Sequence, residues 1–373
     1  MRVLHVIPSV SERSGGPGVA ILPMCRALMK CGVEVLLAAT DDGLSRVGTG
    51  VVDHEGVPAI FFSSQLGESF KYSRSLSVWL DAHVDQFDVG HIHAVFNHSS
   101  VAAARAFRKA RVPYVIRPLG TLDPWSMKQK ALRKRLFWSV AGEKMLNRAA
   151  AVHYTSQAEK TATEGLLGVN HGQVIPLGIE AAPHRRPENS SGSYALVLSR
   201  LHPKKGIDVL IEAFIAMKFY RWRLIIAGEG PPDYVARLKR KAAAAGDKIS
   251  FRGWVDGDEK EELLGHASLL VLPSYQENFG LCVMEALARS VPVLISPHVN
   301  LANEIESAKA GWIAPVEVPA LSATLAEALG NPGELAERGR AGKRLSLNYS
   351  WEQVATDLSK LYTEITNGGA GIH

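Results

Sequence analysis

Two acidic residues in the second half of the chain have a spacing that would let them act on one ligand. Glu277 and Glu285 stand eight residues apart in LLVLPSYQENFGLCVMEALA, with Phe279, Gly280 and Leu281 between them. We expect Glu277 in the loop after a strand and Glu285 about one turn into the next helix. Paired carboxylates can serve as a general acid and base, or they can hydrogen-bond two sets of sugar hydroxyls. Placement on a loop and a helix favours the second role, with one carboxylate on a transferred sugar and the other on a ribose.

A basic group earlier in the chain could neutralise phosphate. In LVLSRLHPKKGIDVLIEAF, Arg200 ends a predicted strand, and Lys204 and Lys205 come just before a predicted helix. A guanidinium fork and a lysine charge beside a helix N-terminus are suited to a diphosphate. The alternative is a solvated basic cluster, which has equal weight when this segment is taken alone.

Glycines follow the first predicted strand in SERSGGPGVAIL. Gly15, Gly16 and Gly18 surround the start of a helix, where free amides favour an anion. The dinucleotide pattern G-x-G-x-x-G is incomplete because Ile21 stands at its third glycine position. Asp41 lies where a ribose-binding acid could follow the second strand, but the incomplete pattern argues against NAD. A tight turn alone is one alternative, and close approach of the backbone to a phosphate or sugar fits better.

Three histidines lie near the end of a strand in DVGHIHAVFNHSS, at positions 91, 93 and 98. A metal triad is one possibility, but His91 and His93 share a strand face with no acid nearby. A histidine at a strand's carboxyl end, facing a cleft, is the better functional candidate. The string Asp256-Gly-Asp258 lies at a predicted helix start, where aspartates commonly cap. We therefore expect no metal.

Length and composition indicate a folded, two-domain protein. The 373 residues contain 46% hydrophobic and 21% charged residues, which fits globular domains of roughly 100–200 residues each and excludes a largely disordered chain. No apolar run approaches the roughly 20 residues that a membrane-spanning helix needs. The opening MRVLHVIPS is too short for a signal peptide and is expected to form a strand. We expect a cytoplasmic protein whose three cysteines are small core or partly buried residues.

Positive charge is concentrated between Arg105 and Arg148. This stretch holds twelve basic residues and two acids, while the whole chain has a formal net charge of +5. Such a patch can favour an anionic membrane surface, a phosphorylated substrate or nucleic acid, and a solvated helix face is the plain alternative. Nucleic acid is the least favoured because no nucleic-acid-binding module accompanies the patch. The densest part, Lys128 to Arg135, is a candidate for peripheral attachment to the inner face of a membrane.

Buried strands alternate with helices along nearly the whole chain, which predicts two parallel α/β domains. Predicted strands are 2–9, 33–40, 58–63, 89–93, 113–118, 151–155, 173–177, 194–199, 223–227, 249–252, 269–272 and 292–295. Predicted helices include 19–30, 99–109, 127–147, 206–217, 233–244, 258–264, 281–288 and a helical tail from Pro319 to about Ile365. We expect an N-terminal domain over 1–180, a linker over 181–193, a second domain over 194–350 and a C-terminal helix over 351–373. Ligands bind at the carboxyl ends of the strands in such sheets, so the site should lie in a cleft where the two domains face each other.

The combination of these segments resembles the family 4 retaining glycosyltransferases, which have the GT-B fold. SRLHPKKGID followed by PSYQENFGLCVMEALA is similar to the family signature, including its E-x7-E pattern. PLGTLDPWSMKQKALRKRLFW resembles the acceptor-side loop of polysaccharide-type members, and AVHYTSQAEK, VIPLGIE, LIIAGEGP and YSWEQVA also fit. The fold implied is two Rossmann-like domains, with the C-terminal helix returning to the first.

The resemblance implies roles for individual residues. At the donor's sugar the resemblance implies His93 and Glu277, with the amides of Phe279, Gly280 and Leu281, and it implies Gly16 at the phosphate or the sugar. Arg200 and Lys205 are implied at the diphosphate. Glu285 is implied at the ribose, and Gly253 and Trp254 near the base. Within this set His93, Arg200, Lys205 and Glu277 are the candidate catalytic residues. His98, Arg117, Asp123 and Trp125 are implied on the acceptor side.

The activity implied is retaining transfer of a hexose from a nucleotide sugar, without a metal or other cofactor. UDP is favoured over GDP, and the family context implies a glycan or lipid-linked acceptor in surface polysaccharide assembly. A sugar-nucleotide epimerase of the same fold and a non-catalytic sugar-nucleotide-binding protein are the alternatives. Neither requires both the basic acceptor-side segment and an intact E-x7-E pattern.

Overall fold

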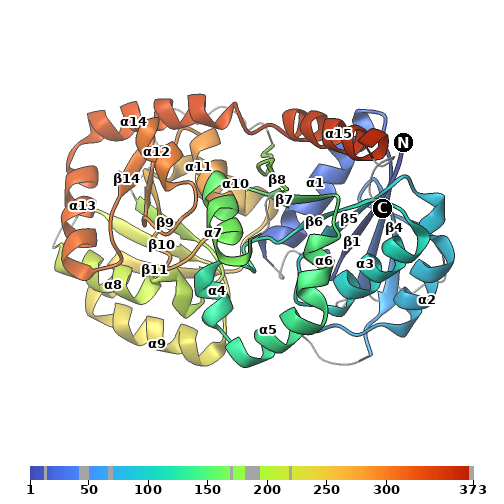
Figure 1. Ribbon diagram of the computed structural model, residues 1–373. Helices are drawn as coiled ribbons and strands as arrows, with labels where there is room; N and C mark the ends of the chain where they lie inside the picture. The colour runs from blue at the N-terminus through green and yellow to red at the C-terminus, as the bar shows by residue number, and fades with distance from the viewer. Residues whose placement is uncertain are drawn as a thin grey trace. The chain divides into compact units, whose positions relative to one another are not determined.

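The residues RVLHVI near the start of the chain form strand β1 (Arg2–Ile7), and all of its side chains after Arg2 are buried. A strand without polar alternation is typical of the centre of a parallel sheet covered on both faces. The computed structural model describes residues 1–11, 15–41, 50–65, 70–168, 171–180, 194–217 and 221–368 (Figure 1). The chain divides into one unit of residues 1–178 and 351–373 and a second unit of residues 179–350.

The sheet of the first unit has eight strands. After β1 they are β2 (Glu34–Asp41), β3 (Val52–His54), β4 (Val57–Ser63), β5 (Val89–His93), β6 (Tyr114–Arg117), β7 (Ala151–Tyr154) and β8 (Gly172–Val174). Their spatial order is β3-β4-β2-β1-β5-β6-β7-β8. Every pairing is parallel except that of the edge strand β3 with β4. The short antiparallel strand β3 was not predicted from the sequence.

Helices cover both faces of this first sheet. They are α1 (Gly16–Lys30), α2 (Arg74–His83), α3 (His98–Ala110), α4 (Pro124–Lys128), α5 (Ala131–Phe137), α6 (Glu143–Asn147), α7 (Gln157–Leu167) and α15 (Trp351–Gly368). Leu4 and Val6 of β1 pack on Leu76 of α2 and Phe107 of α3 in an apolar core. The opposite face carries histidines and meets α1 and α15, which lie against each other (Figure 1). The C-terminal helix therefore belongs to the first unit, as the family resemblance implied.

The second unit is a parallel sheet of six strands. The strands are β9 (Tyr194–Leu198), β10 (Arg223–Ala227), β11 (Ile249–Gly253), β12 (Leu269–Leu272), β13 (Val293–Ile295) and β14 (Gly311–Ile313), in the order β11-β10-β9-β12-β13-β14. The helices are α8 (Ile207–Ala216), α9 (Pro232–Ala242), α10 (Gly257–His266), α11 (Leu281–Ala288), α12 (Ala302–Ser307), α13 (Val318–Gly330) and α14 (Pro332–Ser346). The prediction of two parallel α/β sheets is confirmed.

Each sheet has one point where the strand order reverses. In the first unit the chain moves outward from β1 in one direction and from β5 in the other, so the reversal lies between these two strands. In the second unit it lies between β9 and β12. Loops that leave neighbouring strands in opposite directions open a crevice at their carboxyl ends, where open α/β sheets bind ligands. Arg200 and Lys205 follow β9, and Glu277 follows β12.

Two helical predictions need correction. Residues 127–147 do not form one helix: α4 ends at Lys128, α5 starts after Lys130 in a left-handed conformation (φ 52°), and a π turn spans Trp138–Gly142. The absence of a side chain at Gly142 lets the Trp138 ring lie against the backbone of this turn. The predicted helical tail is also interrupted, into α13, α14 and α15.

The predicted linker, residues 181–193, lies outside the described residues. Among the helices that are described, none is both long and apolar enough to cross a lipid bilayer.

Candidate functional site

Two loops at the strand-order reversal of the second unit are tied together by their backbones. After β9 the chain makes a 3-10 turn, Pro203–Lys205, whose start is capped by the side chain of His202. The amide of Tyr275, in the loop after β12, donates a hydrogen bond to the carbonyl of Lys204 at 2.7 Å. This bond fixes the distance between the two loops and so positions their side chains.

The side chains of these loops form a buried ion pair. Nζ of Lys205 donates to Oε2 of Glu277, and the two side chains are 9% and 17% exposed. Burial alone would raise the pKa of Glu277, but the charges of Lys205, Lys204 and Arg200 outweigh it and hold that pKa below its usual value. Glu277 is therefore an ionised acceptor for hydroxyl groups at neutral pH.

Arg200 and Lys204 differ from Lys205 in exposure and contacts. Arg200 is exposed at the end of β9, and its guanidinium has no ion-pair partner within the described part of the chain. Lys204 is half-buried and donates to Oε1 of Gln276 at 3.2 Å. Lys205 and Arg200 thus bring two positive charges to one loop, one held by a carboxylate and one open to a ligand.

The segment between the two glutamates forms the start of α11. Gly280 has a φ of 73°, which a residue with a side chain rarely adopts, and α11 begins directly after it. No side chain caps this helix start, so its first amides can meet a ligand oxygen. Glu277 is held in place because its amide donates to the carbonyl of His298 and its carbonyl accepts from the amide of Asn300, both at 3.0 Å.

Glu285 lies on α11 and has a partner that sequence reasoning missed. Nζ of Lys260, on α10, donates to Oε1 of Glu285 at 2.7 Å, and the two side chains are about one-quarter and one-fifth exposed. The second carboxyl oxygen of Glu285 makes no hydrogen bond to another described residue. The sequence pattern around Lys260 does not indicate this ion pair, because only the packing of α10 on α11 brings Lys260 to Glu285.

A pocket of about 620 Å³ opens at the carboxyl ends of β9, β10 and β11, where Leu201 lines it. Gly228 and Gly230 bound it, and a Cβ at either position would collide with the carbonyl of Ser199 or Leu201. Glycine is thus required for the close approach of two loops. Gly253 also lines the pocket. The neighbouring Trp254 donates its indole N–H to Asp256 at 2.9 Å. Asp256 therefore holds Trp254, in place of the helix-capping role expected of it.

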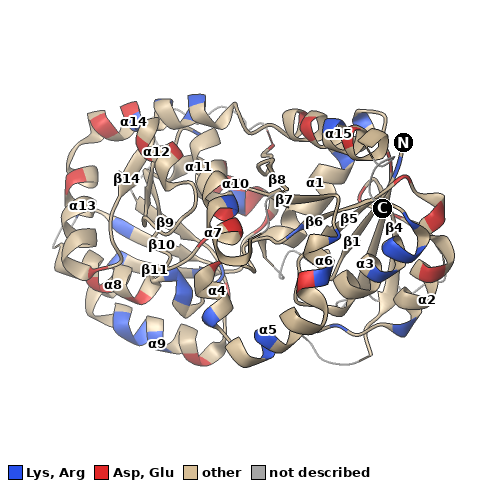
Figure 2. Cartoon of the chain, in the orientation of Figure 1, with Lys and Arg blue, Asp and Glu red and all other residues tan. Residues whose placement is uncertain are grey.

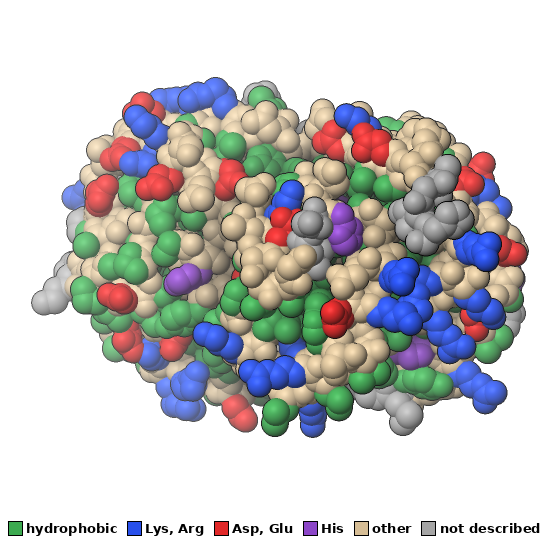
Figure 3. Space-filling model, in the orientation of Figure 1, with side chains coloured by type: hydrophobic (Ala, Val, Ile, Leu, Met, Phe, Trp, Pro, Cys, Tyr) green, Lys and Arg blue, Asp and Glu red, His purple; other side chains and the backbone are tan. Residues whose placement is uncertain are grey.

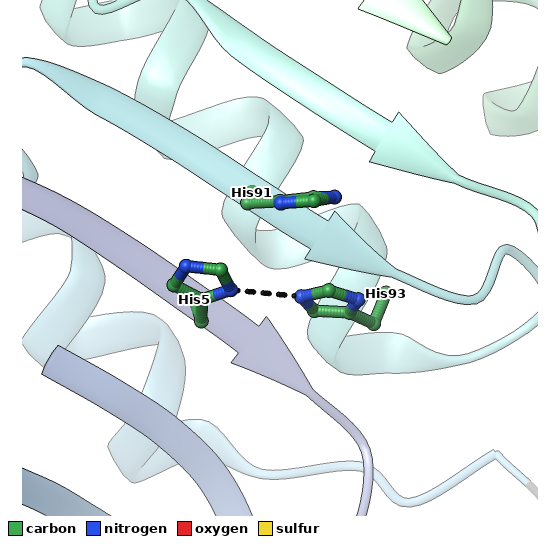
Figure 4. Close-up of side chains that lie close together, drawn as sticks. All are labelled: His5, His91 and His93. Carbon is green, nitrogen blue, oxygen red and sulfur yellow. Dashed lines mark hydrogen bonds between the residues drawn. The ribbon is translucent and has the colours of Figure 1, made fainter. Parts of the chain in front are cut away.

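In the first unit, the predicted donor residues lie at the ends of β1 and β5. Gly16 is the exposed first residue of α1, and no side chain caps that helix start. His93 is the last residue of β5, and its side chain is fully buried. Nε2 of His93 lies 3.1 Å from Nδ1 of His5 (Figure 4), while Nδ1 of His93 has no hydrogen-bond partner.

His93 belongs to a buried chain of polar side chains. Nε2 of His153 lies 2.7 Å from the carbonyl of Ile175, which can only accept, so this nitrogen carries the proton. Nδ1 of neutral His153 then accepts from Nε2–H of His91 at 3.3 Å, and Nδ1 of His91 accepts from the hydroxyl of Tyr362 at 2.6 Å. Burial, with the Arg117 charge second, lowers the pKa of His5 and of His153 to about 3. Burial also holds the pKa of His91 and of His93 well below its usual value, so all four histidines are neutral at pH 7.

This cluster does not have the geometry of a metal site. Ring nitrogens of His5, His91 and His93 come within 4.8 Å of one another. However, both nitrogens of His91 are already hydrogen-bonded, and the rings of His91 and His93 stack with centroids 4.3 Å apart (Figure 4). The buried Arg117 cation is also close enough to lower the histidine pKa values. A neutral hydrogen-bonded core fits these contacts better than a cation site.

The predicted acceptor-side residues do not share one surface. Arg117 is only 1% exposed and touches Sδ of Met24 at 3.7 Å. Asp123 caps α4 by accepting from the amide of Trp125 at 2.8 Å. Nδ1 of His98 accepts from the amide of Ser73 at 3.2 Å, and its other nitrogen lies near Ser77. The structure thus places Arg117 in the interior, and gives Asp123 and His98 contacts within their own unit.

Two Rossmann-like units with charged loops at the strand-order reversal define the GT-B class. Family models confirm this. Residues 15–178 match the glycosyl transferase 4-like domain and residues 179–345 match glycosyl transferases group 1. The chain therefore belongs to the group 1, family 4-like glycosyltransferases, as the sequence resemblance implied.

Curated relatives match about half of the chain. Glycogen synthase of Mycobacterium tuberculosis is 32% identical over 204 residues, covering 52% of this chain and 49% of the relative. D-inositol 3-phosphate glycosyltransferase of Streptomyces avermitilis is 28% identical over 227 residues, covering 57% and 48%. The chain spans about half the length of the curated relatives it matches.

Solved structures show the same fold over nearly the whole chain. HepE of Anabaena, solved with UDP-glucose, has a TM-score of 0.79 at 19% identity, covering 98% of this chain and 100% of the other. Sucrose-phosphate synthase of Thermosynechococcus elongatus has the same score and identity, covering 98% and 99%. WaaG, a glycosyltransferase involved in lipopolysaccharide biosynthesis, has a TM-score of 0.76 at 15% identity, covering 97% and 99%.

Proposed function

We propose that this protein is a retaining glycosyltransferase that moves a hexose from a nucleotide sugar to a glycan or lipid-linked acceptor. The observation that carries the proposal is the buried Lys205–Glu277 ion pair beside the open guanidinium of Arg200. One carboxylate is kept ionised for sugar hydroxyls, and two cations stand next to it for a diphosphate. This combination suits a ligand that joins a sugar to a diphosphate.

In the proposed reaction, the bond between the anomeric carbon and the diphosphate oxygen breaks, and the acceptor hydroxyl oxygen bonds to that carbon. The acceptor proton passes to the departing phosphate oxygen, so charge is balanced when the nucleoside diphosphate leaves. Negative charge builds on the phosphate in the transition state, where Arg200 and Lys205 stabilise it more strongly than in the ground state. The two carboxylates hold the donor's sugar and ribose, and no protein nucleophile or divalent metal takes part.

Other residues have supporting roles in this proposal. The amides of Phe279, Gly280 and Leu281 meet the donor sugar, and the pocket bounded by Gly253 takes the base. Gly16 and the unpartnered Nδ1 of His93 are the contacts expected from the first unit. Asp123 and His98, which accept from the amides of Trp125 and Ser73, shape the acceptor side in this proposal, together with Trp125 and the buried Arg117.

UDP is the preferred nucleotide in this proposal, and the HepE complex with UDP-glucose supports it. A role in surface polysaccharide assembly is supported by WaaG, whose description places it in lipopolysaccharide biosynthesis. The five cations from Lys128 to Arg135 are expected to bring the enzyme to an anionic membrane that carries such an acceptor.

The test is release of nucleoside diphosphate from a panel of UDP- and GDP-sugars, with analysis of the remaining sugar. We expect one donor to give free UDP, and Glu277→Gln and Lys205→Gln to lower that release strongly, whereas Lys241→Gln, which removes an ion pair with Glu212 away from these loops, does not. A changed sugar without free nucleotide would identify an epimerase. Binding without either product would identify a non-catalytic binding protein.

A further inference from the structure

A helical stretch of the first unit carries an apolar stripe on its solvent side. It runs from α5 through the π turn Trp138–Gly142 into α6, ending at Asn147. Leu132, Leu136 and Val140 stand four residues apart, which places them on one face. They are 82%, 67% and 74% exposed. Exposed apolar side chains that gather on one face mark an interaction surface rather than chance exposure.

The same stretch is attached to its unit by a different face. The ring of Phe137 packs edge-on against Phe96 with centroids 5.2 Å apart, and Phe137 and Trp138 both pack against the core. Lys134 also turns inward, donating to the carbonyl and hydroxyl of Ser126 at 2.7 and 3.0 Å. The outer stripe is therefore not needed for folding of this unit, and it has no partner in the described part of the chain.

Positive charges border the apolar stripe. At about 100° per residue, Arg135 lies on one side of it and Arg133 on the other. Within residues 124–148 the exposed cations are Lys128, Lys130, Arg133, Arg135, Lys144 and Arg148, and Glu143 is the sole acid. The ribbon of α5 carries blue Lys and Arg positions in Figure 2, and Figure 3 shows blue and green side chains intermixed along the lower edge of that view. Burial lowers the pKa of Lys134, so that cation belongs to the inner contacts.

The charge pattern decides between possible occupants. A second copy of this chain would bring the same cations face to face, which is unfavourable. A helix with an apolar stripe between basic side chains is suited to the interface of an anionic bilayer, with apolar side chains among the acyl chains and cations at the headgroups. We propose that Leu132, Leu136 and Val140 insert into an anionic lipid surface while the bordering arginines and lysines bind its phosphates.

This inference deepens the membrane contact of the proposed function, and it changes which residues matter. Charge alone would hold the protein near the surface, whereas the stripe predicts insertion. Lys134, one of the five cations counted in the sequence, does not take part. The stripe also explains why large apolar side chains stand next to cations on an exposed helix.

The test is co-sedimentation of the full chain with vesicles of phosphatidylcholine alone and with vesicles that also contain phosphatidylglycerol. Wild type should bind only the anionic vesicles. The double variant Leu132→Ser/Leu136→Ser should bind them at least about tenfold more weakly, because two inserted side chains become polar. Arg133→Gln/Arg135→Gln should lose about fivefold per cation at low salt. Leu166→Ser and Val78→Ser replace apolar residues that are 48% and 62% exposed elsewhere, and should bind as wild type.

Two outcomes would overturn the inference. If the leucine variant binds anionic vesicles as wild type does while the arginine variant does not, the cations adsorb without insertion. If wild type ignores vesicles but forms dimers that the leucine variant loses, a second copy covers the stripe. Val140→Ser is a milder variant for use if the double variant does not fold. Vesicle binding is measured without donor or acceptor, so failure of the proposed transferase activity is seen separately, in the nucleotide-release assay.

Discussion

Tyr362, on the C-terminal helix α15, donates its phenolic hydrogen to Nδ1 of His91 on β5 across 271 residues of sequence, at 2.6 Å. His91 in turn donates to His153, whose other nitrogen donates to the carbonyl of Ile175. One orientation of protons satisfies all of these groups, because a carbonyl stands at one end and a phenol at the other. The last helix is thereby bound to the interior of the first unit by directional bonds as well as by apolar contact.

Removal of the Tyr362 hydroxyl should destabilise the first unit. In Tyr362→Phe, Nδ1 of His91 keeps a buried lone pair without a donor, which costs about 1–3 kcal/mol of unfolding free energy. Urea unfolding followed by tryptophan fluorescence would measure the change. Tyr275→Phe is the matched control, since Tyr275 is 40% exposed. Equal losses in both variants would show that the hydrogen bond to His91 contributes nothing specific.

The buried histidines should make stability fall in acid. The pKa of His5 and of His153 is lowered to about 3 in the folded protein, from 6.5 in the unfolded chain. Between these values the unfolded chain binds more protons, so stability declines as pH falls through this window, by up to about 1.4 kcal/mol per pH unit for each histidine. Urea midpoints measured from pH 7 to pH 4.5 would record the decline.

A conservative variant separates this effect from general acid sensitivity. His153→Gln keeps a donor and an acceptor but no longer titrates, so the slope of stability against pH should become shallower. His298→Gln, at an exposed position, should leave the slope unchanged. If His153→Gln retains the full slope, proton uptake by this cluster does not govern acid stability.

The two cations at the proposed diphosphate site should act on turnover more than on binding. Arg200→Ala or Lys205→Ala should lower kcat about a hundredfold or more, with a smaller change in KM, because each cation meets more charge as the glycosidic bond breaks. Steady-state kinetics on the identified donor would show the split. Lys204→Ala is the neighbouring control, since that side chain is engaged with Gln276. A rise in KM at constant kcat would restrict the pair to ground-state binding.

Variants of the two glutamates should differ in which ligand they bind more weakly. Glu285→Gln should weaken binding of free UDP and of the whole donor, since a hydrogen bond to a charged group contributes about 1.5–3 kcal/mol. Glu277→Gln should leave the affinity for free UDP nearly unchanged while transfer and sugar selectivity decline. Isothermal titration calorimetry with UDP and with the nucleotide sugar would measure both. Equal losses of UDP affinity in the two variants would refute the division of roles.

Lys260 should orient Glu285 for the ribose. In Lys260→Met the carboxylate loses its half-buried ion pair, and UDP affinity should fall about two- to fivefold. Lys241→Met removes a comparable ion pair, with Glu212, away from the proposed site and should not change it. Tighter UDP binding in Lys260→Met would mean that this lysine competes with the ribose for Glu285.

Local sequence pattern determined much of the architecture. Buried β-branched runs predicted the parallel strands because a strand covered on both faces needs apolar residues at every position. The bounds of α11, Leu281–Ala288, agree with the prediction because Gly280 stops the preceding loop and apolar residues follow at helical spacing. The same patterns put Arg200, Lys205 and Glu277 in loops after strands, although their roles stay predictions. The prediction of one helix over residues 127–147 was wrong. Lys130 has a left-handed conformation, and the π turn in which the Trp138 ring lies against Gly142 interrupts the regular helix.

Only the tertiary structure decided which of these residues meet. Lys204 and Lys205 are adjacent, yet the turn before α8 directs Lys205 to Glu277 and Lys204 to Gln276. Lys260 reaches Glu285 because α10 packs on α11. His5 and His93 meet because β1 and β5 are neighbours in the sheet, an order that the chain sequence does not specify. Strand periodicity gives the face on which a side chain lies, whereas strand order, which depends on long-range pairing, gives its neighbours.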